Sequence, residues 1–230
     1  MILQKGQKIN MAKIRSSKEF DDNVKELIIE YLKVESDYRY ALRELSARIE
    51  NLDDYCQANF DHNPIHHIES RIKSAESIIE KMTRRGHSFD MEKLKNYIYD
   101  IAGIRVVCNY ISDIYQIIWL LAKQKDLKIL VQKDYIVRPK PSGYRSFHIV
   151  FLVETYINNE RKSVPVEIQF RTLAMDMWAS LEHELRYKSN NLLTDEQKVN
   201  LRQYAYDLYK VDLNMQRLYI ETNTYNNNDE

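Results

Sequence analysis

Cysteine, glycine and proline are scarce in this sequence, and each scarcity excludes a class of protein. The two cysteines, Cys56 and Cys108, cannot form a disulfide framework in a chain of 230 residues. Four glycines and four prolines are too few for the many tight turns of an all-β protein. No apolar run approaches the ~20 residues of a membrane-spanning helix, and residues 1–20 lack the apolar segment of a signal peptide. We therefore expect a cytoplasmic protein that makes no membrane contact.

Net charge is lacking as well, because 34 Lys and Arg residues balance 34 Asp and Glu residues. A zero net charge argues against a general nucleic-acid binder, so no DNA partner is expected and RNA binding is not indicated. Basic residues nevertheless gather in two clusters, which indicate a localised anionic ligand or, alternatively, a solvated charged face. The clusters contain Arg71, Lys73, Lys81, Arg84 and Arg85, and then Lys133, Arg138, Lys140 and Arg145.

The length predicts one compact domain with appendages, since a domain takes about 150 residues. The spacing of apolar residues is typical of helices at both ends of the chain, whereas the middle mixes strand and helix patterns. We therefore divide the chain into an N-terminal helical extension (1–62), a central domain (63–190) and a C-terminal helix with a frayed tail (191–230). The tail NTYNNNDE has no residues that would build a core.

Each helical end carries an apolar stripe that needs a packing partner. The first stripe predicts contact with another helix, in this chain or in a partner subunit. The second follows Thr194 and Gln197, which have the spacing of a capping box. Both stripes are long for a monomer with a modest sheet, so we expect a homo-oligomer built from these helices. The first comprises Tyr38, Leu42, Leu45, Ile49 and Leu52, and the second Leu201, Tyr204, Leu208, Val211, Met215 and Leu218.

The central domain alternates between strand and helix patterns. Ser74 and Ser112 are candidate N-caps of helices that reach about Arg85 and Gln124. Strands interleaved with helices predict an α/β or α+β sheet with helices packed on it. The strands are predicted at 65–73, 103–110, 127–137, 146–157 and 162–172, with the last two forming a hairpin around residues 158 and 159, and a further helix follows at 172–188.

Two acidic residues are candidates for chemistry. Glu167 shares one face of its predicted strand with Gln169 and Arg171, because strand side chains alternate between faces. Asp100 stands just before the predicted strand that carries Arg105. If these strands are neighbours, one carboxylate could hold Mg²⁺ while the other takes a proton. The alternatives are an ordinary solvent face for Glu167 and a cap or turn role for Asp100.

The loop PKPSGYRSFH mixes cations with an aromatic ring. Lys140 and Arg145 could pair with phosphates while a purine stacks on Tyr144, with His148 close by. The alternative is an ordinary turn with Tyr144 packed on the core, since Pro-Ser-Gly-Tyr is a good turn sequence by itself.

The predicted helix after Ser74 is a second source of cations. Ser77, Lys81 and Arg84 would lie on one face of this helix, because residues three and four apart are neighbours there. The sequence contains no glycine-rich phosphate-binding loop, so side-chain cations would have to bind any phosphate.

Four stretches, in this order, resemble the synthetase domain of the RelA/SpoT family, and specifically its single-domain members, the small alarmone synthetases. They are RIKSAESIIEK, DIAGIRVV, KPSGYRSFH and VEIQFRTLAMDMWASLEHEL, and the resemblance covers residues 64–188. It implies an α+β fold, a nucleotidyltransferase-like mixed β-sheet flanked by helices, with helical N- and C-terminal extensions. It also implies transfer of pyrophosphate from ATP to the ribose 3′-hydroxyl of GDP or GTP, which makes AMP and the alarmone ppGpp or pppGpp of the stringent response. We expect no room for the hydrolase domain of the longer relatives, so synthesis alone is implied.

The resemblance also implies roles for individual residues and an assembly. Asp100 would hold Mg²⁺ on the ATP phosphates, and Glu167 would be the base for the 3′-hydroxyl or a second Mg²⁺ ligand. Arg71 and Arg105 would flank the adenine, and Tyr144 would stack on guanine. By analogy the oligomer would be a tetramer. The remaining ATP-binding residues would be Lys73, Ser77, Lys81 and Arg84, and the remaining GDP- or GTP-binding residues Lys140, His148, Asp176 and Glu182.

Two positions depart from the usual pattern of these synthetases. Ala75 stands where proline is frequent, and Asp176 stands where asparagine is frequent. An acid at Asp176 can accept hydrogen bonds from guanine N1–H or N2–H₂ but cannot donate one to O6. Two other functions stay open: another nucleotidyltransferase of the same fold, and a catalytically silent RNA-binding module that uses the basic clusters as a phosphate track.

Overall fold

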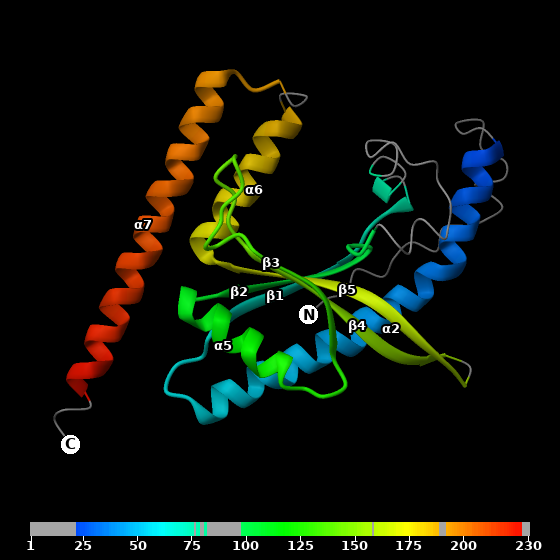
Figure 1. Cartoon of the computed structure of the whole chain (residues 1–230), viewed down its shortest axis with the longest axis horizontal. Helices are drawn as coiled ribbons and strands as arrows, with labels where there is room; N and C mark the ends of the chain where they lie inside the picture. The colour runs from blue at the N-terminus through cyan, green and yellow to red at the C-terminus, as the bar shows by residue number, and fades with distance from the viewer. Residues whose placement is uncertain are drawn as a thin grey trace.

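The computed structural model describes residues 22–75, 77–78, 81, 98–157, 159–188 and 192–226. Within these residues the strands form a five-stranded sheet in the order β1-β2-β5-β4-β3 (Figure 1). β2 and β5 run parallel, and the other neighbours run antiparallel. The predicted α+β fold, a mixed sheet flanked by helices, is confirmed. The elements are α2 (Asp22–Asn59), β1 (Ile65–Ile72), β2 (Ala102–Cys108), α5 (Ile111–Ala122), β3 (Lys128–Asp134), β4 (Phe147–Ile157), β5 (Glu160–Thr172), α6 (Leu173–Lys188) and α7 (Asp195–Asn226).

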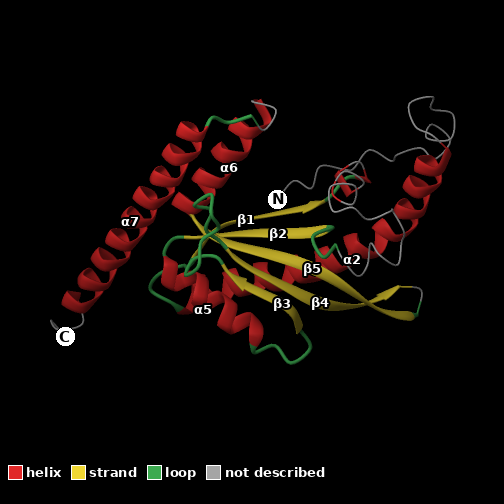
Figure 2. Cartoon of the chain, turned by 45° about the horizontal axis from the view of Figure 1, so that its top comes forward, coloured by secondary structure: helices red, strands yellow, loops and turns green. Residues whose placement is uncertain are grey.

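One face of the sheet is apolar and is covered by α2 and α5. The predicted stripe of α2, which includes the fully buried Leu45 and Ile49, packs on β4 and β5 and belongs to the same hydrophobic core as their side chains Phe151 and Ile168. We expected this stripe to pack against another helix, and that prediction was wrong. The sheet itself offers the larger apolar surface, so α2 runs diagonally across it (Figures 1 and 2).

The hairpin predicted between the two longest strands is present. β4 and β5 pair continuously from Phe147 with Phe170 to Ile157 with Glu160. Asn159 in the turn has φ 64°, in the left-handed region that asparagine tolerates better than most residues. Residue 158, the other predicted turn position, lies outside the described residues.

Ser112 does not cap α5, contrary to the prediction from sequence. The helix begins earlier, at Ile111, and the Asp113 carboxylate accepts a hydrogen bond from the Tyr110 backbone N–H at 3.0 Å. The N–H of Ser112 instead donates to Oε1 of Gln216 in α7 at 2.9 Å. Two of the backbone N–H groups at the start of α5 are therefore bonded by other side chains, one by Asp113 of the first turn and one by Gln216 of α7.

Two other predicted caps are confirmed, at Ser74 and Thr194. The Ser77 N–H donates to Ser74 Oγ at 3.3 Å, and Thr194 and Gln197 form the reciprocal bonds of a capping box at 2.9 and 3.2 Å. Most of the predicted helix 74–85, including Arg84, lies outside the described residues. At the other end of the chain, α7 runs to Asn226 and so extends into the tail that we expected to be frayed.

α6 and α7 form a pair of helices at one end of the sheet (Figure 2). Thr172, the last residue of β5, caps α6 by accepting the Met175 N–H at 3.2 Å, and its hydroxyl donates to Asp212 of α7 at 2.7 Å. Trp178 of α6 packs with Ala205 of α7. No helix in the described part of the chain is both long and apolar enough to cross a membrane.

Candidate active site

The polar face of the sheet carries two rows of side chains that cross the strands. In one row, Glu167 of β5 pairs with Gly103 of β2, which pairs with Arg71 of β1. In the other, Gln169 of β5 lies between Arg105 and His148 on the two neighbouring strands, and Glu69 and Lys133 extend the row to both edges. Residues directly opposite one another on paired strands share a face, so the register gathers these groups on one surface.

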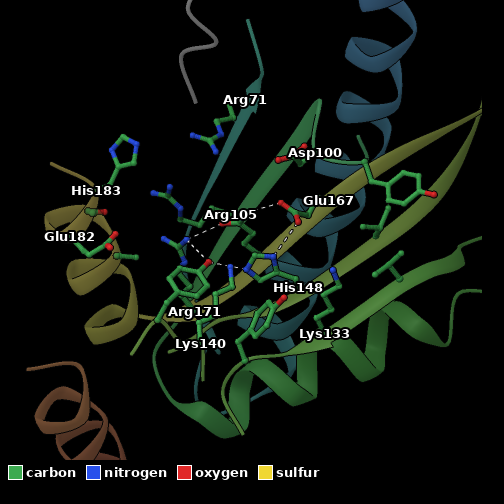
Figure 3. A pocket seen from close by; sticks show the side chains of 18 of the residues that line it. Arg71, Asp100, Arg105, Lys133, Lys140, His148, Glu167, Arg171, Glu182 and His183 are labelled. Atoms are coloured by element: carbon green, nitrogen blue, oxygen red, sulfur yellow. Dashed lines mark hydrogen bonds and ion pairs between the residues drawn. The ribbon is translucent and has the colours of Figure 1, made fainter. Parts of the chain in front are cut away.

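A cavity of about 780 Å³ lies over these rows. Its floor is the polar face of the sheet, and its walls come from α6, from the loop after β3 and from the residues before β2 (Figure 3). This volume is within the usual range of ligand-binding cavities. The cavity is lined by Arg71, Lys81, Tyr99, Asp100, Arg105, Val131, Lys133, Tyr135, Lys140, Tyr144, His148, Val150, Glu167, Gln169, Arg171, Ala179, Ser180, Glu182 and His183.

Asp100 is held at the edge of the cavity by two lysines. Its Oδ2 accepts hydrogen bonds from Lys73 Nζ at 2.5 Å and from Lys81 Nζ at 2.6 Å. Burial alone would raise the pKa of this carboxyl, but the two ammonium groups outweigh burial and lower the pKa to about 2. The other oxygen, Oδ1, is buried and accepts no hydrogen bond from the described residues. An ionised carboxylate with one unused oxygen suits a hard cation such as Mg²⁺.

Glu167 is the second acid of the cavity, and Figure 3 shows it beside Asp100. Its Oε1 lies 3.1 Å from His148 Nδ1, and its Oε2 accepts a hydrogen bond from Gln169 Nε2 at 2.7 Å. Burial would raise the pKa of Glu167, but the His148 and Gln169 contacts outweigh it, and the pKa lies below its usual value. The carboxylate is therefore ionised at neutral pH. The alternatives of a solvent face for Glu167 and an isolated turn role for Asp100 do not describe this arrangement.

The loop after β3 brings an aromatic and cationic group to the cavity. Lys140 Nζ lies 4.6 Å from the ring centroid of Tyr144 and 4.7 Å from that of Tyr135, within reach of both π faces. Tyr144 Oη lies 2.8 Å from His148 Nε2. The structure thus unites Lys140, Tyr144 and His148, as predicted. Sequence reasoning missed Tyr135, because the strand predicted to continue to residue 137 ends at Asp134 and a turn directs the tyrosine into the cavity.

The residues expected to bind ATP lie at the β1 and β2 side, with different local contacts. Arg71, Lys81 and Arg105 line the cavity, and Arg105 donates to Glu69 at 3.0 Å. Lys73 reaches Asp100 but is not part of the cavity lining. Ser77 is exposed and bonds to the Ser74 cap, also outside the lining, and Arg84 lies outside the described residues.

Two further predicted residues lie on α6. Glu182 lines the cavity and pairs with Arg186 of the same helix. Asp176 lies behind the lining, where its Oδ1 is 2.9 Å from Arg171 Nη1 and 3.3 Å from Arg105 Nε. The structure therefore places Asp176 between two arginines.

Among the lining residues to which the prediction from sequence gave no role are Lys133, Gln169, Arg171 and His183. Gln169 and Arg171 were identified as part of a polar strand face, and Lys133 as part of a basic cluster, so a signal existed for all three. For His183 the signal was its place next to Glu182 on the helix that follows the last strand, four residues after Ala179 on the same face.

Comparison with known proteins identifies relatives over most of the chain. Residues 70–192 match the region found in RelA / SpoT proteins. The GTP pyrophosphokinase YwaC of Bacillus subtilis (strain 168) is 44% identical over 165 residues, which are 70% of this chain and 79% of that protein. The GTP pyrophosphokinase YjbM of the same organism is 35% identical over 181 residues, 79% of this chain and 84% of that protein. The crystal structure of small alarmone synthetase 1 from Bacillus subtilis bound to its product pppGpp superimposes with a TM-score of 0.78 at 33% identity, over 84% of this chain and 97% of that chain.

Proposed function

The chain belongs to the RelA/SpoT family, and from this premise we propose that it is a small alarmone synthetase. It transfers pyrophosphate from ATP to the 3′-hydroxyl of GDP or GTP and produces AMP together with ppGpp or pppGpp. The observation that carries this proposal is the meeting of Asp100 and Glu167 in one cavity whose walls bear lysine and arginine side chains. Two nucleotides with several phosphates require such a combination of acids and cations.

Glu167 is the group we assign to the proton of the attacking hydroxyl. The 3′-oxygen of the guanosine nucleotide forms a bond to the β-phosphorus of ATP, and the bond from that phosphorus to the oxygen shared with the α-phosphate breaks. AMP leaves with this oxygen, and the hydroxyl proton passes to the ionised Glu167 carboxylate. A correctly placed base contributes about a hundredfold to ten-thousandfold to such a rate.

Asp100 is the residue we assign to Mg²⁺, and a second Mg²⁺ ligand is the alternative role of Glu167 to that of the base. Mg²⁺ in phosphoryl-transfer sites takes one or two carboxylates together with substrate phosphates, and when bound it neutralises charge on the triphosphate. The Oδ1 of Asp100 fits this use, because it is buried and accepts no hydrogen bond from the residues that the structure describes. Lys73 and Lys81 fix the carboxylate by its other oxygen.

The two nucleotides are assigned to opposite sides of the cavity. Arg71, Lys81 and Arg105 on the β1 and β2 side would bind ATP through its phosphates and adenine. Tyr144, with Lys140 against its ring, would stack on guanine on the β3 and β4 side. Glu167 on β5 lies between the two sides, where the 3′-hydroxyl and the β-phosphate must meet.

Nucleotide separation after incubation with ATP, GDP and Mg²⁺ tests the proposed function. We expect AMP and ppGpp in equal amounts from the wild-type chain. Release of pyrophosphate with a joined nucleoside monophosphate would instead identify another nucleotidyltransferase. Nucleic-acid binding without turnover, weakening steeply with salt, would identify an RNA-binding module.

We also propose that the chain assembles as a homo-oligomer, a tetramer by analogy with small synthetases. Apolar side chains on the outer faces of α6 and α7 support this, because Met177, Leu181, Val211 and Leu218 are each about half exposed. Exposed apolar surface of this extent is typical of protein–protein contacts. Light scattering at working concentration tests the assembly, and a monomer peak would refute it.

A further inference from the structure

Five side chains that line the cavity form a closed loop of hydrogen bonds, which we call the Glu167 ring. One arm runs from Arg171 Nη2 to Tyr144 Oη at 2.9 Å, from there to His148 Nε2 at 2.8 Å, and from His148 Nδ1 to Glu167 Oε1 at 3.1 Å. The other arm runs from Arg171 Nη2 to Gln169 Oε1 at 2.9 Å and from Gln169 Nε2 to Glu167 Oε2 at 2.7 Å. Both oxygens of Glu167 are therefore linked to a single guanidinium.

The two ends of the Glu167 ring limit the direction of its hydrogen bonds. Arginine can only donate, so Tyr144 Oη accepts from Arg171. The ionised Glu167 can only accept, so His148 carries a hydrogen on Nδ1 and donates it to Glu167, and Nε2 of the neutral imidazole accepts the hydrogen of Tyr144 Oη. In the other arm the amide oxygen of Gln169 faces Arg171, which turns the Gln169 NH₂ group towards Glu167.

Burial makes this arrangement costly to rearrange. The Arg171 side chain is only 7% exposed, and its Nη1 forms an ion pair with Asp176 Oδ1 at 2.9 Å. A buried guanidinium needs a counter-ion, which Asp176 supplies from α6. The same Asp176 oxygen lies 3.3 Å from Arg105 Nε, so the carboxylate also joins the two sides of the cavity. The acid at this position therefore has a structural use that an uncharged amide would not have.

We propose that Arg171 is a positioning residue for pyrophosphate transfer, with Asp176 as its counter-ion. Arg171 acts through Tyr144 and Gln169 to hold the guanine-stacking ring, the His148 tautomer and the Glu167 carboxylate in one arrangement before substrates bind. This inference rests on the proposed function and adds a residue that the assignment of nucleotide-binding roles left out.

The test compares steady-state constants of Arg171→Met with those of the wild type. We expect kcat to fall about ten- to hundredfold, because the Glu167 carboxylate and the aromatic ring of Tyr144 lose their fixed positions. The KM for GDP should rise, because Tyr144 is the residue assigned to guanine. The KM for ATP should stay within about twofold of the wild-type value, since the Glu167 ring does not include the cations assigned to ATP. A merely structural loss would reduce the amount of active enzyme and leave both KM values unchanged, which would overturn the proposal.

A double-mutant cycle supplies the second readout. In the Tyr144→Phe background one arm is already broken, so Arg171→Met should lower kcat by a smaller factor than it does in the wild type. Independent, multiplicative effects would contradict a role exerted through Tyr144. The matched control is Arg161→Met, because Arg161 is exposed on the distant hairpin and pairs with Glu154, and this variant should behave as wild type.

A second pair of variants tests the Glu167 ring if Arg171→Met does not fold, and the wild type separates a failure of the proposed function from a failure of this inference. If Arg171→Met does not fold, as judged by circular dichroism, the cycle of Tyr144→Phe with Gln169→Leu examines the same two arms with Arg171 in place. Sub-multiplicative effects on kcat support the ring, and multiplicative effects overturn it. Failure of the wild type to make ppGpp would refute the proposed function itself, whereas wild-type synthesis with an unchanged KM for GDP in Arg171→Met would refute only the role of Arg171.

Discussion

Tyr144 Oη lies 2.8 Å from Nε2 of His148, and the opposite nitrogen of that imidazole lies 3.1 Å from Glu167. The aromatic ring proposed to stack on guanine is thus one side chain away from the proposed base. Binding of the acceptor nucleotide and placement of the base are linked through His148.

Tyr144→Ala should raise the KM for GDP more than the KM for ATP. Loss of the ring removes base stacking, worth about 1–3 kcal/mol, while the cations on the β1 and β2 side stay in place. Initial rates with each nucleotide varied in turn measure both constants. Equal effects on both nucleotides would contradict the stacking assignment.

Glu167→Gln should abolish synthesis while the fold survives. The amide has the shape of the carboxylate but cannot take the hydroxyl proton, so kcat should fall about a hundredfold or more. The rate of AMP formation measures this, with circular dichroism as the check on folding. Glu154→Gln, which alters an exposed acid of the hairpin, is the control and should keep wild-type rates. Normal turnover by folded Glu167→Gln would remove this residue from the mechanism.

Asp100→Asn should also abolish synthesis. The substitution removes the charge that faces Lys73 and Lys81 and weakens the oxygen assigned to Mg²⁺. We expect a rate loss of about a hundredfold or more that extra Mg²⁺ reverses only in part. Initial rates over a Mg²⁺ titration measure it, with Asp126→Asn on the exposed Arg48 pair as the control. An unchanged rate and Mg²⁺ dependence would exclude Asp100 as a ligand.

Gly143→Ala should destabilise the protein. Gly143 has φ +93°, and a Cβ atom there would lie 2.7 Å from Ala205 Cβ in α7. Both the backbone conformation and the crowding oppose a side chain, so the free energy of unfolding should fall by about 1–3 kcal/mol. Urea denaturation measures the change. Gly103→Ala is the matched control, because a Cβ at that position meets nothing within 4 Å. Equal stability of the two variants would show that the loop and α7 separate freely.

Asp212→Asn should stabilise the protein at neutral pH and have little effect in acid. Burial raises the pKa of Asp212 to about 6, and the Thr172 hydrogen bond and the Arg145 charge offset only part of this rise. Between about pH 4 and pH 6 the unfolded chain releases this proton while the folded chain retains it, so ionisation disfavours folding at higher pH. The variant should therefore be more stable than wild type by about 1–3 kcal/mol at neutral pH, with the difference vanishing near pH 4. Denaturation at several pH values measures this, and a difference independent of pH would contradict it.

Local sequence patterns predicted those features that depend only on neighbouring residues, such as the face of a strand and the cap of a helix. Alternation along β5 placed Glu167, Gln169 and Arg171 on one face, and the hydroxyls of Ser74 and Thr194 cap helices as expected. The pattern failed at Ser112, because the helix begins one residue before it and Asp113, on the first turn, accepts the N–H of the N-cap residue Tyr110. It also failed for the stripe of α2, because an apolar stripe specifies that a helix face is buried but not what buries it.

The sequence by itself determined the family, the strand faces and the acids and cations available for chemistry, because these follow from residue identity, spacing and alternation. Only the tertiary structure decided which of these side chains contact one another. The parallel pairing of β2 with β5 brings Gly103 beside Glu167 and leaves Asp100 at the same cavity, although far from it along the chain. The contacts of Arg171 with Tyr144 and Asp176 likewise join a strand, a loop and a helix. Such contacts depend on the strand order and on the placement of the helices. The packing free energy of the whole core selects both of these, and no short stretch of sequence encodes them.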